Sequence, residues 1–286
     1  MKAAALNKRD DWISKGMYPG IVTNCTLGSD GCAIDSAGHH VIFCPSIYWG
    51  DREDVQSSQF QILGMPTAGT FTQEICISKQ LLYLAPNHLN PVEAAAIPLA
   101  GLTAWRALMT QGQCQKQNRV LITGIGGGVA LFAMQFSIAL GCETWVTSSS
   151  DDKLNRAKKM GAAGGFRYDR NETLKGRFDV IIDSAGGAGF GALVKALNPS
   201  GRLIFYGGTC GKWPEISPQS LFFKQAHIIG STMGSPKEFS EMLDFSSKHK
   251  IKPVIDSQYK LNDAHNAFER LRSPNRFGKV VFSISA

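Results

Sequence analysis

The segment V-L-I-T-G-I-G-G-G-V-A at residues 120–130 decides the fold, because an apolar run leads through a glycine-rich turn directly into a helical pattern. In such a turn the backbone N–H groups and the positive end of the helix dipole converge where a pyrophosphate can bind. Side chains would block that approach, which explains Gly124, Gly126, Gly127 and Gly128. A tight turn without a ligand is the plainer alternative, but the flanking strand and helix favour dinucleotide binding.

The glycine spacing differs from the usual G-x-G-x-x-G fingerprint. Gly124 and Gly126 are followed by Val129 where the third glycine would stand, with Ala130 next. A second register, Gly124-x-x-Gly127-x-x-Ala130, keeps a small residue at the contact between helix and strand. Both registers predict a phosphate-binding turn.

Residues 119–252 alternate short β-prone runs with helical patterns, which is typical of a parallel sheet covered on both faces. The runs VLIT, DVIID and RLIFY are continuously apolar, as doubly covered strands require. We expect helices over Val129–Leu140, ending at Gly141, and over Asp152–Met160. The expected strands are Arg119–Thr123, Glu143–Thr147, Gly165–Tyr168, Phe178–Asp183, Arg202–Tyr206 and Ala226–Gly230. The sequence therefore predicts an α/β fold with a doubly wound, Rossmann-type parallel sheet.

The end of the second expected strand bears on the choice of coenzyme. In this fold an acidic residue about 20 positions after the glycines selects NAD by bonding the ribose 2′-hydroxyl. The strand ends here in Thr147-Ser148-Ser149-Ser150, and Lys153 follows on the next helical turn. Hydroxyls and an ammonium can hold a 2′-phosphate, so the sequence favours NADPH. Alternatively the serines cap a helix with Asp151 or Asp152, and either acid could select NADH instead.

Residues 1–88 are expected to form a separate unit of strands and loops. They contain many turn signals between β-prone runs such as Val41–Cys44 and Phe71–Ile77. The following Asn90-Pro91-Val92-Glu93 is typical of a helix start, with a cap, a proline and an acid in the favoured positions. The expected C-terminal elements are a helix, Leu261–Leu271, and a strand, Lys279–Ile284.

Composition excludes several classes of protein. The chain has 286 residues, 43% hydrophobic and 19% charged, which is typical of globular proteins and unlike disordered or fibrous ones. Its apolar runs are shorter than the roughly 20 residues of a membrane helix, and its first residues do not resemble a leader, so we expect a cytoplasmic protein without membrane binding. The seven cysteines form no C-x-x-C pair, which argues against a disulfide framework or zinc knuckle. The net charge of +7 is dispersed, so nucleic-acid binding is not expected.

Several stretches carry a family resemblance that extends over nearly the whole chain. They are Asn7-x-Arg9-Asp10 followed by Tyr18-Pro19-Gly20, Leu27–Gly31, Ala94–Trp105, the glycine-rich turn, and Phe277–Val281. In this combination the chain resembles the medium-chain dehydrogenase/reductase superfamily, and specifically its zinc-free quinone oxidoreductase and alcohol dehydrogenase-like members.

The resemblance implies two domains with the nicotinamide in the cleft between them. Such proteins pair a GroES-like β-barrel catalytic domain, to which the C-terminal segment returns, with a Rossmann domain. On this pattern residues 1–88, completed by 253–286, form the catalytic domain, and residues 89–252 form the dinucleotide-binding domain. Relatives usually form dimers or tetramers, so a homodimer or homotetramer is expected.

The resemblance also implies hydride transfer without zinc. Zinc-dependent relatives have a cysteine where this chain has Asn7 and a histidine where it has Ser29, and neither replacement is a good zinc ligand. Asn7 and Tyr18 are then the candidates to polarise a substrate oxygen. Trp12 lies where zinc-free relatives commonly have an aromatic residue, and it is the third candidate for the catalytic site. Alternatively Asn7 is a turn or cap residue and Tyr18 a rim residue. The implied small-molecule acceptors of hydride from NADPH, or from NADH, are quinones and α,β-unsaturated carbonyls, favoured over aldehydes and alcohols.

Family positions carried over to this chain complete the expected coenzyme site. The pyrophosphate would lie on the glycine-rich turn and Val129, and the adenosine phosphate beside Ser148 and Ser149. Its family contacts are matched by Lys153 and Tyr168. The residues expected along the nicotinamide half are Thr103, Gly207, Gly208 and Met233.

The first expected domain, residues 1–88, lacks segments that the relatives have. Relatives carry several tens of residues of β structure before the motif that this chain reaches at Asn7, and a second gap falls at residues 35–41. We therefore expect a truncated barrel with unpaired strand edges, as in a shortened isoform or an incomplete gene model. An alternative function follows, namely nucleotide binding with impaired or no turnover.

Overall fold

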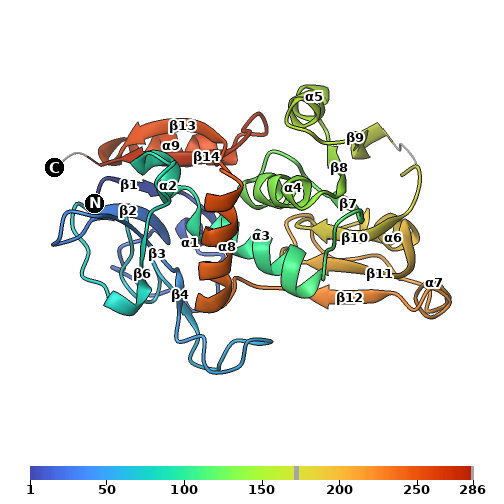
Figure 1. Ribbon diagram of the computed structural model, residues 1–286, viewed down its shortest axis with the longest axis horizontal. Coiled ribbons are helices and arrows are strands. Elements are labelled where there is room, and N and C mark those ends of the chain that lie inside the picture. The colour runs from blue at the N-terminus through green and yellow to red at the C-terminus, as the bar shows by residue number, and fades with distance from the viewer. Residues whose placement is uncertain (171–173, 285–286) are drawn as a thin grey trace. The chain divides into compact units, whose positions relative to one another are not determined.

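The computed structural model of the protein describes residues 1–170 and 174–284. The chain divides into two compact units. Unit 1 comprises Met1–Leu102 and Met233–Ala286, and unit 2 comprises Thr103–Thr232. Each unit is built on its own sheet, and the two are described separately (Figure 1).

Unit 2 contains a six-stranded sheet with the order β12-β11-β10-β7-β8-β9, in which every neighbouring pair is parallel. The strands are β7 (Arg119–Ile122), β8 (Glu143–Ser148), β9 (Gly164–Arg167), β10 (Phe178–Asp183), β11 (Leu197–Phe205) and β12 (His227–Gly230). This order confirms the predicted Rossmann-type sheet. The strand order reverses between β7 and β10, and ligands bind such sheets at the carboxyl ends of the strands beside that reversal.

Apolar residues on both faces of this sheet explain why helices cover it. Leu121 and Ile181 pack with Phe190 of α6, whereas the alternating residues Val120 and Ile182 are buried on the other face. Figure 1 shows α4 beside β7 and β8. The helical elements are α3 (Pro98–Trp105, which begins in unit 1), η2 (Arg106–Gln111), α4 (Gly128–Leu140), α5 (Asp151–Lys159), η3 (Tyr168–Arg170), α6 (Phe190–Lys195) and α7 (Gln219–Phe222).

The predicted end of α4 at Gly141 is confirmed. Gly141 adopts a left-handed backbone conformation (φ 90°), and its N–H donates to the carbonyl oxygens of Ile138 and Ser137. Glycine reaches this conformation without the steric cost of a Cβ, so the helix ends there and the chain turns into β8.

Unit 1 contains a six-stranded sheet with the order β13-β14-β1-β2-β3-β6 and a separate pair, β4 with β5. The strands are β1 (Ala3–Ala5), β2 (Asp30–Ile34), β3 (His40–Phe43), β4 (Ser46–Ile47), β5 (Gln61–Ile62), β6 (Leu82–Leu84), β13 (Ile255–Lys260) and β14 (Lys279–Ser283). β13 and β14 are parallel and the other pairs antiparallel. Ala4 pairs with Phe282, so the C-terminal strand β14 is part of this sheet. Among the described residues the larger sheet is open, with edges at β13 and β6.

The helices of unit 1 pack against this sheet. α9 lies along β13 and β14 (Figure 1), which buries Ala267 and Leu271 with Val280. The predicted start of α2 is confirmed, because the side chain of Asn90 accepts the N–H of Glu93 at 2.9 Å. The helical elements are α1 (Lys8–Ser14), η1 (Lys79–Leu81), α2 (Pro91–Ala95), α8 (Pro236–Lys248), η4 (Leu261–Asp263) and α9 (Ala264–Arg272). None of the helices in the described ranges combines the length and hydropathy that a membrane crossing needs.

The β-prone run Phe71–Ile77 was predicted wrongly, since it forms no strand in the described structure. Its backbone groups find partners outside a ladder. The N–H of Phe71 donates to Leu27 O at 2.9 Å, and the carbonyl oxygen of Gln73 accepts the N-terminal amino group of Met1.

The unit boundaries also differ from the expected ones at residues 88 and 252. Unit 1 includes α2 and α8, because both pack on its strands. Phe239 of α8 meets Tyr83 edge to face with ring centroids 4.8 Å apart. The hydroxyl of Ser46 donates to the carbonyl oxygen of Gly234, just before α8, at 2.6 Å.

Candidate functional site

The glycine-rich turn joins β7 to α4 where the strand order of the parallel sheet reverses. Gly124 and Gly126 have positive φ angles of 66° and 118°, which side chains rarely permit. The N–H of Ile125 donates to Thr147 O at 2.8 Å, which ties the turn to β8. Gly127 is the N-cap residue of α4 and supplies no side-chain cap. The first N–H groups of a helix have no acceptor within the helix, so this end of α4 can bind a phosphate.

Gly127 is a glycine that the fold itself does not require. Its backbone angles (φ −74°, ψ 150°) suit any residue. Among the described residues, the nearest atom to an added Cβ would be the carbonyl oxygen of Gly124, at 3.8 Å. Neither strain nor crowding explains the missing side chain, whereas an open approach for phosphate does. Gly128 and Val129, the other predicted contacts, lie in the first turn of α4.

A buried polar network connects this turn to the neighbouring strands. Thr123 Oγ1 donates to Asp183 Oδ1 at 2.6 Å, which joins the carboxyl ends of β7 and β10. Asp183 Oδ2 accepts the N–H of Gly186 at 2.8 Å, and Asp183 O accepts the N–H of Tyr206, which follows β11, at 3.1 Å. A buried carboxylate is stable only when its oxygens are hydrogen-bonded in this way. Asp183 was not predicted as a site residue, although the acid that closes the apolar run DVIID was a usable signal.

The serines at the end of β8 act partly as helix caps. Ser150 is the N-cap residue of α5, and its Oγ accepts the N–H of Lys153 at 3.4 Å. Ser148 is buried, and its Oγ accepts the N–H of Ser150 at 3.1 Å. The capping alternative is therefore observed for Ser150, while Ser149 is exposed.

Charged side chains of both signs lie beside these serines. Asp151, the first residue of α5, forms ion pairs with Arg167 at 2.6 Å and with Arg170 at 3.1 Å. Both guanidinium groups contact the same oxygen, Oδ2, and Arg167 also donates to both carboxylate oxygens of Asp169, at 2.8 and 2.7 Å. Tyr168 lies between the two arginines in the chain and is 60% exposed. Neither arginine was predicted as a site residue, and with Lys153 on α5 they bring three cations to this edge of the sheet.

A hollow of about 340 Å³ lies at the carboxyl ends of β11 and β12. It is lined by Phe205, Tyr206, Gly207, Gly208, Trp213, Gly230 and Ser231. Crowding requires glycine at 207, because a Cβ would lie 2.7 Å from the carbonyl oxygen of Ser184. The ring of Trp213, another residue that the sequence analysis missed, stacks on Phe190 with centroids 4.0 Å apart. Gly207 and Gly208 thus line a space of the size that small ligands occupy.

The first predicted catalytic residue, Asn7, belongs to a buried cluster in unit 1. Its Nδ2 donates to Asp30 Oδ2 at 2.8 Å, and its Oδ1 accepts from Lys279 Nζ at 2.6 Å. Lys279 Nζ also donates to Asp30 Oδ2 at 2.8 Å, and Asp30 Oδ1 accepts the N–H of Leu99 at 2.7 Å. The amide of Asn7 is therefore engaged on both sides, and its second N–H is the group that could reach a substrate oxygen.

Asp10 lies beside this cluster and has a shifted pKa. Its Oδ2 accepts the N–H of Asn7 at 2.7 Å, while its Oδ1 has no hydrogen-bond partner among the described residues. Burial raises the pKa of Asp10 to about 6, although the hydrogen bond from Asn7 and the charge of Arg9 act in the opposite direction. A carboxyl group with such a pKa exchanges a proton near neutral pH.

The other two predicted catalytic residues lie close to the Asn7 motif. Trp12 is a half-buried residue of α1, with Lys8 Nζ 5.8 Å from its ring. Tyr18 is also half-buried, and the guanidinium carbon of Arg9 lies 5.1 Å from its ring. Asn7 is the N-cap residue of α1, so its position fits the cap alternative as well as the catalytic one.

The two remaining nicotinamide candidates belong to different units. Thr103 is buried on α3 and opens unit 2. Met233 lies in unit 1, has a positive φ of 44°, and packs with Trp49 and Leu99. The predicted site residues are therefore distributed over both units, with Asn7 in unit 1 as well.

The residues at the two zinc-ligand positions do not fit a zinc ion. The hydroxyl of Ser29 is buried and accepts from Arg9 Nη1 at 2.9 Å. Asn7 is held between Asp30 and the ammonium of Lys279, whose positive charge would repel a metal cation. Zinc in proteins takes thiolate, imidazole or carboxylate ligands. No group of three such side chains comes together in the part of the chain that the structure describes.

Comparisons with known proteins place this arrangement in a family. The chain is 35% identical to the Zinc-type alcohol dehydrogenase-like protein YogA of Leptosphaeria maculans, over 99% of this chain and 89% of that protein. The protein belongs to the medium-chain dehydrogenase/reductase superfamily. The family model described as Zinc-binding dehydrogenase matches residues 128–248 of this medium-chain dehydrogenase/reductase, a region that includes α4 and most of the parallel sheet.

Two further relatives show how far the likeness extends. A crystal structure of an NAD-dependent alcohol dehydrogenase superimposes with a TM-score of 0.91 at 30% identity, covering 99% of this chain and 90% of that one. The Crotonyl-CoA reductase of Streptomyces avermitilis is 29% identical over 81% of this chain and 58% of its own length. This medium-chain dehydrogenase/reductase is therefore related to both alcohol dehydrogenases and reductases, which confirms the family predicted from the sequence.

Proposed function

We propose that the protein is an NADPH-dependent reductase of quinones or α,β-unsaturated carbonyls that works without zinc. The observation that carries the proposal is Gly127, an unstrained and uncrowded glycine at the N-terminus of α4. Its missing side chain leaves room for the coenzyme pyrophosphate against the helix amides. Bound there, the coenzyme would supply the hydride, while the protein orients the reactants and excludes water.

The preference for NADPH rests on charge at the edge of the parallel sheet. β8 ends without a carboxylate, and Asp151 is engaged by Arg167 and Arg170. Lys153 lies in the first turn of α5, where its ammonium can contribute to a 2′-phosphate site. An NAD-dependent alcohol dehydrogenase is among the similar structures, so NADH is the competing coenzyme that the experiment must include.

The nicotinamide ring is proposed to occupy the hollow beside Gly207 and Gly208. Trp213 forms an aromatic wall of this hollow, which suits a flat ring. After β11 and Tyr206 the chain continues with two glycines, Gly207 and Gly208, so the backbone can approach a ligand closely.

The proposed acceptors follow from the polar groups of unit 1. Asn7 and Tyr18 offer hydrogen bonds, which polarise an oxygen less strongly than a metal ion does. Quinones and conjugated carbonyls accept hydride with such modest help. The relationship to Crotonyl-CoA reductase, whose name denotes reduction of a conjugated thioester, supports this class.

The test is NADPH oxidation by the purified protein with menadione, 2-cyclohexenone, crotonyl-CoA and a simple aldehyde. We expect turnover of about 1 s⁻¹ or faster with at least one of the first three acceptors, the same rate after dialysis against a chelator, and slower oxidation of NADH. The variant Gly127→Val serves as the control that any activity comes from this site.

Two results would overturn the proposal. Loss of activity on chelation, with recovery on adding zinc, would show that the enzyme needs the metal after all. No activity with any acceptor, despite NADPH binding, would favour the alternative of a nucleotide-binding protein without turnover, in which the open sheet of unit 1 does not support catalysis.

A further inference from the structure

Two cysteines of unit 2, Cys114 and Cys142, bring their sulfur atoms to 3.4 Å from each other. Both backbones are held in place by hydrogen bonds. The N–H of Cys114 donates to Leu108 O at 3.1 Å, and the N–H of Cys142 donates to Ser137 O at 3.0 Å. Both cysteines are free thiols in the structure, so the close approach is a property of the reduced fold.

The two thiols differ in environment. Cys114 is buried, whereas Cys142 is only partly covered. The sulfur of Cys142 lies 3.3 Å from the carbonyl oxygen of Gln115, to which its thiol can donate. The hydrogen bond between the two thiols lowers the pKa of Cys142 and raises that of Cys114, and for Cys142 it outweighs the opposing effects of burial and the Asp179 carboxylate. Cys142 therefore ionises first, with Cys114 as the proton donor that stabilises it.

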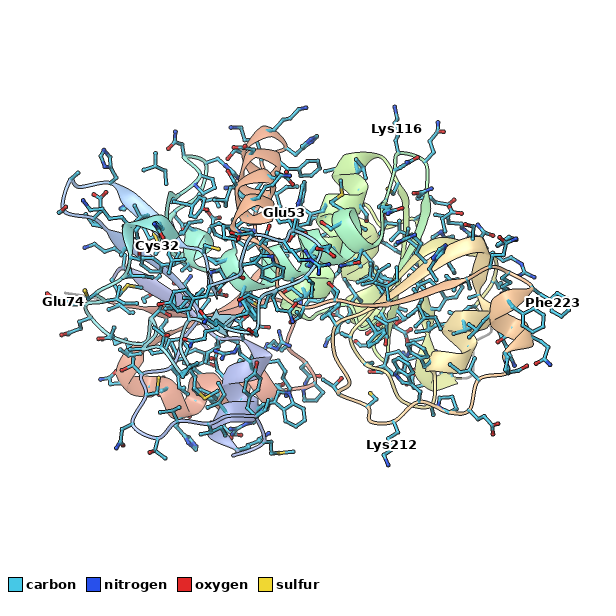
Figure 2. The ribbon with its side chains drawn as sticks, turned by 90° about the horizontal axis from the view of Figure 1, so that it is seen from below. Cys32, Glu53, Glu74, Lys116, Lys212 and Phe223 are labelled. Atoms are coloured by element: carbon cyan, nitrogen blue, oxygen red, sulfur yellow. The ribbon has the colours of Figure 1, made fainter. Side chains whose placement is uncertain are left out.

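The pair lies close to the surface of the protein. Lys116, two residues after Cys114, projects outward in Figure 2. Its aliphatic chain passes over Gly141, where an added Cβ would lie 3.2 Å from Lys116 Cγ. A small oxidant can therefore reach the partly exposed Cys142, whereas Cys114 is buried.

We propose that Cys142 and Cys114 form a reactive dithiol that a peroxide converts into an intramolecular disulfide. The Cys142 thiolate attacks a peroxide oxygen, so that an S–O bond forms, the O–O bond breaks, and hydroxide or an alkoxide leaves. The resulting sulfenic acid is attacked by the sulfur of Cys114, the S–S bond forms, and water departs with the proton of the Cys114 thiol. Two electrons pass from the two thiols to the peroxide. The sulfurs need to approach by roughly 1.4 Å to reach bonding distance.

The disulfide would join the two ends of the segment that contains β7, the glycine-rich turn and α4. It would lie away from the proposed coenzyme site. Cys114 precedes β7 and Cys142 directly precedes β8, whereas the glycine-rich turn follows the other end of β7. Cross-linking residues 114 and 142 restricts the unfolded chain over β7, the turn and α4, which stabilises the folded state. The oxidised protein should therefore be more resistant to heat and bind NADPH as before.

The experiment treats the wild-type protein with hydrogen peroxide and maps its disulfides by mass spectrometry of peptides. We expect loss of two of the seven thiols, one linked peptide pair containing Cys114 and Cys142, and a rise in Tm of roughly 5–10 °C. Dithiothreitol should reverse all three changes. The Kd for NADPH should stay within about twofold of its reduced value.

Variants separate the attacking from the resolving thiol. In Cys114→Ser the sulfenic acid at Cys142 should persist long enough to be trapped by dimedone, whereas Cys76→Ser, which removes an exposed thiol, should behave as wild type. A wild-type protein that keeps all seven thiols, or that links other cysteines or separate molecules, would refute the proposal. The wild-type map decides this even where a variant fails to fold, and it does not depend on the proposed reductase activity.

Discussion

Lys279 Nζ donates to Asp30 Oδ2 at 2.8 Å, and the two side chains are 4% and 0% exposed. Lys279 begins β14 and Asp30 begins β2, with β1 paired between these strands. Asn7, just after β1, bonds to both of them. The ion pair therefore fastens three neighbouring strands where zinc-dependent relatives are expected to hold a metal ligand, and its energetic role can be measured directly.

We expect Lys279→Met to destabilise unit 1 by about 3–5 kcal/mol, because it leaves the carboxylate of Asp30 buried without its cation. Urea unfolding measures the change. The matched control is Arg52→Ala, which removes a cation from the exposed ion pair with Asp54 and should cost at most about 1 kcal/mol. Equal losses of unfolding free energy in the two variants would show that the buried ion pair stabilises the protein no more than the exposed one does.

The pKa of Asp10 predicts an unusual pH dependence of stability. Its folded-state pKa of about 6 lies above the ordinary 3.8, so the folded protein binds the proton more tightly than the unfolded chain does. This group therefore contributes stability that is complete below pH 4 and is lost as the pH rises through 6. Asp11, whose pKa is lowered to about 2, acts in the opposite sense below pH 4.

The variant Asp10→Asn isolates this contribution, because Asp11 and the other acids are common to both proteins. Between pH 7 and pH 4 the wild type should gain roughly 2.4 kcal/mol of unfolding free energy relative to the variant. Unfolding curves at several pH values measure the difference. A difference that stays constant with pH would contradict the shifted pKa.

Gly127→Val tests the phosphate-binding turn. The valine fits the backbone and has room, so we expect a stability loss of only about 1 kcal/mol but a loss of NADPH affinity of tenfold or more. Gly189→Val is the control, since Gly189 is also a helix N-cap residue with open space around it. Tryptophan fluorescence titration gives both Kd values. Unchanged NADPH binding in Gly127→Val would place the coenzyme elsewhere.

Lys153→Ala tests the choice of coenzyme. Losing one charge-assisted contact to the 2′-phosphate should raise the Kd for NADPH about tenfold and leave that for NADH within about twofold. Lys159→Ala, on the exposed surface of the same helix, should change neither value. Equal weakening of both coenzymes in Lys153→Ala would mean that the lysine supports α5 and does not contact the phosphate.

The sequence predicted the parallel sheet well because its signals are local. Strand β10 has the predicted bounds, Phe178–Asp183, and α4 ends at the predicted Gly141. Continuous apolar runs show which strands are covered on both faces, and a glycine with positive φ marks the end of a helix. The turn itself was found for the same reason, since strand, glycines and helix follow one another directly in the chain.

Sequence alone thus determined the Rossmann-type sheet, the glycine-rich turn between β7 and α4, and the family. Only the tertiary structure decided that Asn7 is held by Lys279, a residue 272 positions away, and that Cys114 meets Cys142. It also decided that Phe71–Ile77 forms no strand. The physical reason is that patterns of polarity specify local conformation, whereas contacts between distant residues depend on which strands become neighbours when the chain folds.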